Sequence, residues 1–298
     1  MSIPNLKKTD FEVVSLKRNP TSPRTLFGLI MSAIAGLFTL MAIVPLFIIL
    51  TYLLTRGIGA LSASVFTELP PPPLVDGGGF GNAIVGTAIM VGIGALISVP
   101  LGIMAAIYLS EFQEGKASDW IRFATNVLSG VPSIIVGVFA YSAVVLTTKS
   151  YSAWAGGFAL SILMLPIIVR TTDESLKLVP QDVRQASVGV GANRYQTVLQ
   201  VVLPAALPAI ITGITLAVAR AAGETAPLLF TALFTQFWPN WNNLLVEPTA
   251  SLAVLVYNFA IVPFKNQQEL AWGAAFVLVL MVLVTSIISR LATAKRTY

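Results

Sequence analysis

Two opposite charges stand inside an apolar stretch of this sequence. Arg220 and Glu224 interrupt the run 204–231, within the segment Ala-Arg-Ala-Ala-Gly-Glu-Thr-Ala-Pro. Residues four apart share one face of a helix, and a charge at the bilayer centre costs about 2.5–3.5 kcal/mol, so the pair needs a reason. A guanidinium offers a planar fork of donors to an oxyanion, and a carboxylate can hold that fork between anions. We interpret the pair as part of a substrate pathway; a self-neutralising structural pair is the alternative.

Hydroxyl groups accompany breaks in the helical backbone at two places. Gly223 and Pro227 interrupt the hydrogen bonds beside the charged pair, which membrane helices tolerate where the freed groups line a cavity. Thr225 is therefore a candidate hydroxyl donor on the same pathway. Pro132 interrupts an earlier apolar stretch next to Ser133, a second candidate, although serines in membrane helices often bond their own backbone.

The composition explains why charges are so informative here. The 298 residues are 56% hydrophobic and only 10% charged, whereas soluble domains are typically about a quarter charged. Cysteine and histidine are absent from the sequence, which removes disulfides, thiolate and imidazole metal sites and histidine-based catalytic pairs. Glu224 is the sole acid within a predicted span, so an intramembrane acid–base enzyme would have a single catalytic group. We expect no enzyme, metal or cofactor in this chain.

Long uncharged stretches predict an all-α polytopic membrane protein. Crossing about 30 Å of hydrocarbon needs roughly 20 apolar residues as a helix. Six spans satisfy this, near 27–54, 83–109, 123–147, 152–170, 204–231 and 270–291. They define a cytoplasmic tail at 1–26, a six-helix membrane domain at 27–292 and a second tail at 293–298. The apolar segment 251–263 is too short to span, and we expect an external interfacial or re-entrant helix there.

The basic residues predict the orientation. With these spans, 14 of the 18 Lys and Arg residues fall on one side, three on the other, and Arg220 remains in the membrane. The positive-inside rule then puts both termini in the cytoplasm. The pI of about 9.6 thus reflects the membrane topology. We expect contact with membrane lipids and no nucleic-acid partner.

The longest cytoplasmic connection, 171–203, has the punctuation of two short helices. Pro180 suits a first helical position, and small and apolar residues follow at helical spacing. Gly189 and Gly191 end this helix, and Asn193 with Gln196 predicts a capped second one. Such a pair suits insertion into a groove on another protein, or packing under its own bundle; periodicity leaves both open.

This connection contains a motif that resembles the EAA loop of permease subunits in binding-protein-dependent ABC importers. The motif is Gln185-Ala186-Ser187-x-x-x-Gly191-Ala192, followed by Val-Val-Leu-Pro over 201–204. In that family the loop is a coupling helix that docks into an ATPase subunit. The sequence differs from the pattern in having Gln185 for Glu, Ser187 for Ala and Val201 for Ile. No phosphate-binding Gly-x-x-x-x-Gly-Lys-Ser/Thr motif occurs, so ATP and Mg²⁺ would be bound by a separate ATPase.

The segment around Arg220 and Glu224 resembles the fifth span of phosphate-importer permeases, a PstA-like family. Ala83–Thr87 in the second span and Val131–Gly137 in the third also resemble sequences of that family. The resemblance covers 27–292. It implies ATP-driven phosphate import by alternating access, with this chain as one half of the translocation pathway in the inner membrane. It also implies a heterodimer with a homologous permease subunit, two ATPase subunits and an external phosphate-binding protein. A sulfate or molybdate permease and a non-transporting structural subunit are the alternatives.

Overall fold

The structure is a computed structural model that describes residues 22–112, 115–243 and 246–294, with side chains to residue 291. Every regular element in these ranges is helical. The helices are Pro23–Gly59 (α1), Ser64–Thr67 (α2), Gly81–Glu111 (α3), Lys116–Gly130 (α4), Ser133–Ala140 (α5), Leu146–Thr148 (α6), Ala153–Lys177 (α7), Gln181–Gly189 (α8), Arg194–Thr197 (α9), Leu203–Ala222 (α10), Ala226–Thr231 (α11), Leu252–Ala260 (α12) and Lys265–Ala294 (α13). Two π-helical turns, Tyr141–Val145 (η1) and Val198–Val202 (η2), join neighbouring helices.

Residues 53–298 form one compact unit, and residues 1–52 are a second unit that is described by itself. Most of α1 belongs to the second unit. It is 37 residues long and lacks charges from Thr25 to Thr55, so it is apolar around its circumference, as a lipid-facing helix should be. Most of the predicted tail 1–26 and the last four residues of the tail 293–298 lie outside the described residues.

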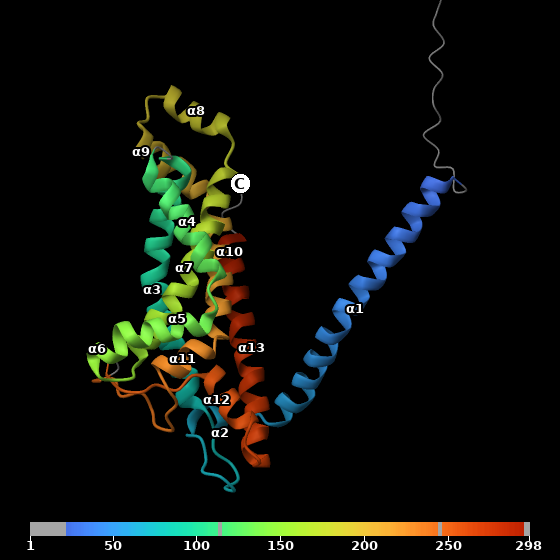
Figure 1. The fold of residues 1–298 in the computed structure, drawn as a ribbon, viewed down its shortest axis with the longest axis vertical. Helices are drawn as coiled ribbons and strands as arrows, with labels where there is room; N and C mark the ends of the chain where they lie inside the picture. Colours follow the sequence, from blue (N-terminus) through green and yellow to red (C-terminus); the bar gives the residue numbers. More distant parts are fainter. Residues whose placement is uncertain (1–21, 113–114, 244–245, 295–298) are drawn as a thin grey trace, which may run out of the picture. The chain divides into compact units, whose positions relative to one another are not determined.

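Helix α7 is the centre of the compact unit (Figure 1), packed against α3, α4, α5, α10 and α11. Small residues let the helix axes approach closely, as is usual in membranes. At Gly157 a Cβ atom would lie only 2.5 Å from Cγ2 of Ile93 on α3, and at Gly213 of α10 it would collide with Thr171. The buried core around α7 therefore depends on glycine at the crossing points.

Five single helices in the described residues are long and apolar enough to cross a membrane: α1, α3, α7, the helix ending at Ala222, and α13. A sixth crossing exists only if α4 and the helix Ser133–Thr148 are counted together, and these are bent by 106°. The predicted span 123–147 is therefore two helices joined at a sharp bend. Pro132 has no N–H to donate, and the chain turns at Val131 and Pro132.

The predicted fifth span, 204–231, is also not one helix. Helix α10 ends at Ala222, residues 223–225 are non-helical, and α11 begins at Ala226. Pro227 lies in the first turn of α11, where a backbone N–H would have no helical partner. The proline is therefore compatible with the start of a new helix, and the chain does not continue as one kinked helix. Two of the six predicted spans are thus divided into half-helices.

The short segment 251–263 forms α12, which packs against α13 and α3 inside the bundle. Leu252, Val254 and Leu255 are fully buried, and the Leu252 backbone N–H donates to the Thr87 hydroxyl of α3 at 2.9 Å. The Ser251 hydroxyl caps the helix. The first half of α12 is therefore buried as a core helix is, and its interfacial or re-entrant position stays a prediction.

Candidate functional site

Arg220 and Glu224 form an ion pair, as their spacing predicted. Nε of Arg220 lies 3.6 Å from Oε1 of Glu224. The two side chains differ in burial, with 60% of Arg220 and 15% of Glu224 exposed. Within the described part of the chain, the two terminal guanidinium nitrogens have no other ion pair or hydrogen bond. The guanidinium of Arg220 is therefore held through Nε, and its two terminal nitrogens are open to a further partner.

The packing of α10 fixes the direction of Arg220. Ala217 and Ala221 lie on the buried face of α10, whereas Leu216, one turn before Arg220, is 60% exposed. A helical residue follows the face of its i−4 neighbour, so Arg220 lies on the exposed stripe of α10. The opposite face of α10 is packed against the core through Ala217 and Ala221, so it has no space for the Arg220 side chain.

This arginine is placed deep along the membrane axis. Ala217 and Ala221 share a core cluster with Leu160 and Met164, which are near the middle of α7. Helix α7 is itself one of the membrane-spanning helices. A guanidinium at that depth is too costly to face lipid, so the exposed stripe of α10 must face protein or water.

The two broken spans meet through their second halves. Helix α11, after the break at 223–225, packs against α5, after the break at Pro132. The approach is closest at Gly137, where a Cβ atom would lie 2.6 Å from Cα of Pro227. The backbone breaks predicted separately in the two stretches are therefore joined by a single packing contact.

The two candidate hydroxyl residues stand at the starts of these half-helices. Thr225 is the N-cap residue of α11, and its carbonyl oxygen accepts from Leu228, but its side chain makes no capping bond. Ser133 is the first residue of α5, one turn before Gly137. Both are half-buried. The structure brings their helices together and gives no direct contact between Ser133 and the charged pair.

The segment 171–203 contains the two predicted helices, α8 and α9, with α8 starting at Gln181, one residue later than expected. Asn193 and Gln196 form the predicted capping box, with both hydrogen bonds at 2.9 Å. Gly191 joins the helices with a φ of +93°, a conformation that glycine adopts without strain. We refer to residues 181–197 as the coupling segment.

The EAA-like residues of the coupling segment divide into two groups. Gln185, Ala186 and Gly191 are exposed, and Ala192 is half-buried. Ser187 is buried, and its hydroxyl lies 3.0 Å from that of Thr197, so it closes α8 onto α9 and is not part of the outer surface. The serine in place of the usual alanine thus has a structural role that the motif alone does not indicate.

Several apolar side chains remain exposed around the coupling segment, among them Val183, Val188, Val190 and Tyr195. Val190 is 86% exposed. Several exposed apolar side chains on so short a segment favour a protein-binding surface.

Sequence reasoning missed the ion pairs at this end of the bundle. Asp173 of α7 is buried and binds Arg122 at 3.2 Å and Lys177 at 2.5 Å. Glu111, at the end of α3, pairs with Arg184 of α8. The positive-inside rule used these basic residues only as markers of orientation. Arg122 and Arg184 are 51 and 73 residues from their acidic partners, so local patterns could not identify these two pairs; only Lys177, four residues from Asp173, has a local partner.

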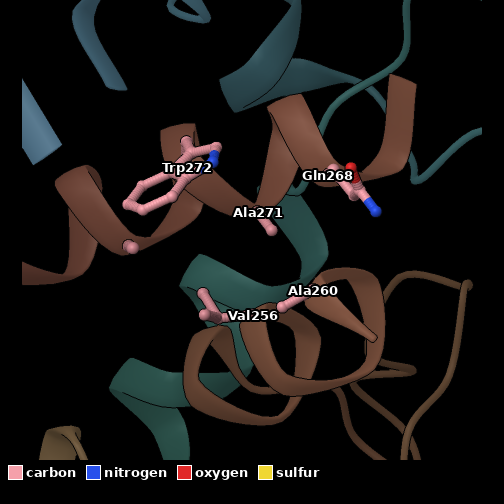
Figure 2. Close-up of a pocket in the computed structure, with 6 residues that line it drawn as sticks. Val256, Ala260, Gln268, Ala271 and Trp272 are labelled. Atoms are coloured by element: carbon pink, nitrogen blue, oxygen red, sulfur yellow. The ribbon is translucent and has the colours of Figure 1, made fainter. Parts of the chain in front are cut away.

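An apolar cavity of about 330 Å³ lies between α12 and α13. Figure 2 shows Val256 and Ala260 of α12 facing Ala271 of α13, with Trp272 and Gln268 at its sides. Its lining contains no ionised group, so nothing in it suits an anion.

Comparison with known proteins agrees with this arrangement. Residues 98–296 match the family described as "Binding-protein-dependent transport system inner membrane component". The chain is 43% identical to the phosphate transport system permease protein PstA of Haemophilus influenzae, over 87% of this chain and 89% of the relative. It is 41% identical to the PstA protein of Yersinia pestis, over 81% of both chains.

Solved structures share the fold at low identity. A chain of the MetNI methionine ABC transporter in an inward-facing conformation has a TM-score of 0.56 at 18% identity, covering 73% of this chain and 94% of that chain. A chain of a bacterial alginate ABC transporter has a TM-score of 0.59 at 12% identity, covering 91% and 96%. The apolar helices and the family description both indicate a multi-pass inner-membrane protein. The chain belongs to the family of binding-protein-dependent transport system inner membrane components.

Proposed function

We propose that this chain is the permease subunit of an ATP-driven phosphate importer and forms half of the translocation pathway. The observation that carries the proposal is the open guanidinium fork of Arg220, which is 60% exposed in the last turn of α10 and bound through Nε to Glu224. Phosphate permeases of the PstA type are the relatives with 41–43% identity, and they support phosphate as the substrate.

Arg220 would bind the phosphate oxygens as the anion passes. A dianion loses its hydration in an apolar bundle at a prohibitive cost unless donors replace the water. The planar fork can donate two parallel hydrogen bonds to two oxygens of one anion. Glu224 would pair with the guanidinium again when the anion leaves. This competition keeps phosphate binding weak enough for release. Thr225 and Ser133 are the proposed hydroxyl donors beside this path.

The partners follow from the exposed surfaces and the family. A homologous permease subunit would cover the exposed stripe of α10 and complete the path as a heterodimer. Two ATPase subunits would bind ATP with Mg²⁺ and receive the coupling segment, chiefly at Gln185, Ala186, Gly191 and Ala192. An external phosphate-binding protein would deliver the anion. In this arrangement both termini, with the tails 1–26 and 293–298, are cytoplasmic.

ATP binding would close the ATPase dimer and move the coupling segments, which would turn the bundle between inward-facing and outward-facing states. The breaks in the third and fifth predicted spans are where the pathway helices would bend. Helices α5 and α11, which follow the two breaks, pack on each other, and we expect them to move together.

The substrate class is tested with the whole complex in proteoliposomes that contain ATP. Uptake of labelled phosphate should depend on ATP and on the binding protein, and excess unlabelled sulfate or molybdate should not compete. Competition by either anion would favour the sulfate or molybdate alternative. Absence of uptake of all three anions in an assembled, ATP-hydrolysing complex would favour a structural subunit.

A further inference from the structure

Long charged side chains connect the coupling segment to the end of α3. In the described structure the main backbone contacts of α8 are with α9 and η2, and Figure 1 shows α8 set apart at one end of the bundle. A cavity of about 490 Å³ separates it from the bundle, lined by residues that include Glu111, Arg184 and Arg194. Helix α8 is joined through the chain to α7 and, by way of α9 and η2, to α10, whereas its connection to the end of α3 runs through the side chains that cross this space.

Glu111 is the bundle residue on which those side chains converge. Its carboxylate forms an ion pair with Arg184 of α8, and the two side chains are only 10% and 14% exposed. Arg184 also donates from Nη2 to the backbone oxygen of Leu176, near the end of α7, at 2.7 Å. Helix α8 is thus bonded to the ends of two membrane-spanning helices through one arginine.

The second helix of the coupling segment is bonded to the same place. Arg194 donates to the backbone oxygen of Glu111, and its guanidinium lies 4.7 Å from the ring centre of Phe112. The Phe112 ring is in turn 5.4 Å from that of Tyr195. Arginine over an aromatic face adds attraction to the hydrogen bond. Residues 111 and 112 therefore hold both α8 and α9.

Further hydrogen bonds connect the end of α3 to α4, the helix before the break at Pro132. Arg122 of α4 donates to the backbone oxygen of Leu109 at 3.1 Å and to the Asp173 carboxylate of α7 at 3.2 Å. Helix α4 precedes the break at Pro132, and α5 after it packs on α11 beside Glu224. A continuous set of contacts thus joins the coupling segment to the helix pair next to the proposed phosphate site.

We propose that Glu111 is a positioning residue for transport: its ion pair with Arg184 makes the coupling segment and α3 move as one body. The proposal rests on the coupling role proposed above. A largely buried pair is suited to this task because loss of one partner leaves the other charge uncompensated, which makes the geometry specific. The Arg170–Glu174 pair nearby, with side chains 72% and 63% exposed, has no such constraint.

The joint movement can be measured directly because the sequence has no native cysteine. Spin labels at Gln181→Cys on α8 and Met104→Cys on α3, both exposed positions, report the distance between the two helices in the assembled complex. With Glu111 intact, the distance distribution should keep its width when ATP is added. With Glu111→Gln it should broaden. An unchanged distribution in Glu111→Gln would overturn the proposal.

Transport provides the functional comparison. Glu111→Gln should lower phosphate uptake per ATP hydrolysed by about tenfold, while the ATPase subunits still copurify and hydrolyse ATP. Glu174→Gln, which breaks only the exposed pair, is the matched control and should leave this ratio unchanged. Normal coupling in an assembled Glu111→Gln complex would overturn the role.

Two further variants separate a specific pair from general damage. The double variant Glu111→Gln with Arg184→Gln should be no worse than Arg184→Gln alone, whereas additive losses would show that the residues act independently. If Glu111→Gln does not assemble, Arg184→Lys replaces it in the distance measurement, because lysine lacks the fork that reaches both Glu111 and Leu176. The distance measurement needs no phosphate, so failure of phosphate uptake in the wild type would contradict only the proposed function.

Discussion

Arg220 and Glu224 are one helical turn apart, yet only Arg220 lies in a helix: α10 ends at Ala222, and Glu224 belongs to the break that follows. Their 3.6 Å contact therefore joins a rigid helix to a segment that can change its backbone conformation. Arg220 is open to its surroundings and Glu224 is largely covered. This asymmetry suits a guanidinium that exchanges between a covered carboxylate and a passing anion.

Replacing Glu224 by Gln tests that exchange. The variant removes the charge that competes with phosphate for Arg220, so phosphate should bind more tightly and leave more slowly. We expect both KM and the maximal uptake rate to fall, by about fivefold to tenfold each, in uptake measurements at several phosphate concentrations. A higher KM with an unchanged maximal rate would mean that Glu224 acts in binding and not in release.

The contact between the two half-helices is tested at Gly137. Gly137→Val adds a branched side chain where even a Cβ atom would lie 2.6 Å from the backbone of Pro227. Because α5 and α11 cannot both stay in place, the complex should lose about 1–3 kcal/mol of stability and most of its uptake. Thermal unfolding of the purified complex measures the first effect.

The matched control for this change is Gly92→Val on α3. A Cβ atom at Gly92 would meet no neighbouring atom within 4 Å. The same substitution should therefore leave the unfolding temperature and the uptake near the wild-type values. Equal effects at positions 92 and 137 would show that the α5–α11 contact has no special importance.

Part of this arrangement could be predicted from the sequence, because apolar runs and local punctuation are properties of neighbouring residues. The all-helical membrane fold, the capping box at Asn193 and the pairing of Arg220 with Glu224 are of this kind. The divided spans were harder. Pro132 and Gly223 were identified as interruptions, but a proline can kink a helix or end it, and the choice depends on packing such as that of Gly137 on Pro227.

The ion pairs Glu111–Arg184 and Asp173–Arg122 could not be predicted for a different reason. Arg122 and Asp173 are 51 residues apart, and Glu111 and Arg184 are 73 apart, so no helical periodicity links them. The burial of Ser187 is a similar case, since its partner Thr197 belongs to the other helix of the coupling segment. Such partners are determined by how the helices pack, which one sequence does not specify.

The turn of the coupling segment is tested at Gly191. Its φ of +93° is unfavourable for a β-branched residue, so Gly191→Val should displace α8 relative to α9 and weaken docking of the ATPase. We expect less ATPase to copurify, with unchanged membrane insertion. Gly189→Ala is the control, because Gly189 is in open space and has an ordinary φ. Full ATPase recovery with Gly191→Val would contradict the docking role.

The central claim is that Arg220 contacts phosphate during transport, and ATP-dependent uptake by an Arg220→Gln complex tests it most directly. Removing the charged fork should reduce phosphate uptake by at least about 100-fold, because a buried anion loses its strongest donor. Lys116→Gln, at an exposed lysine at the start of α4, should transport normally. The account predicts an assembled Arg220→Gln complex that hydrolyses ATP without importing phosphate. Wild-type uptake by that complex would contradict it.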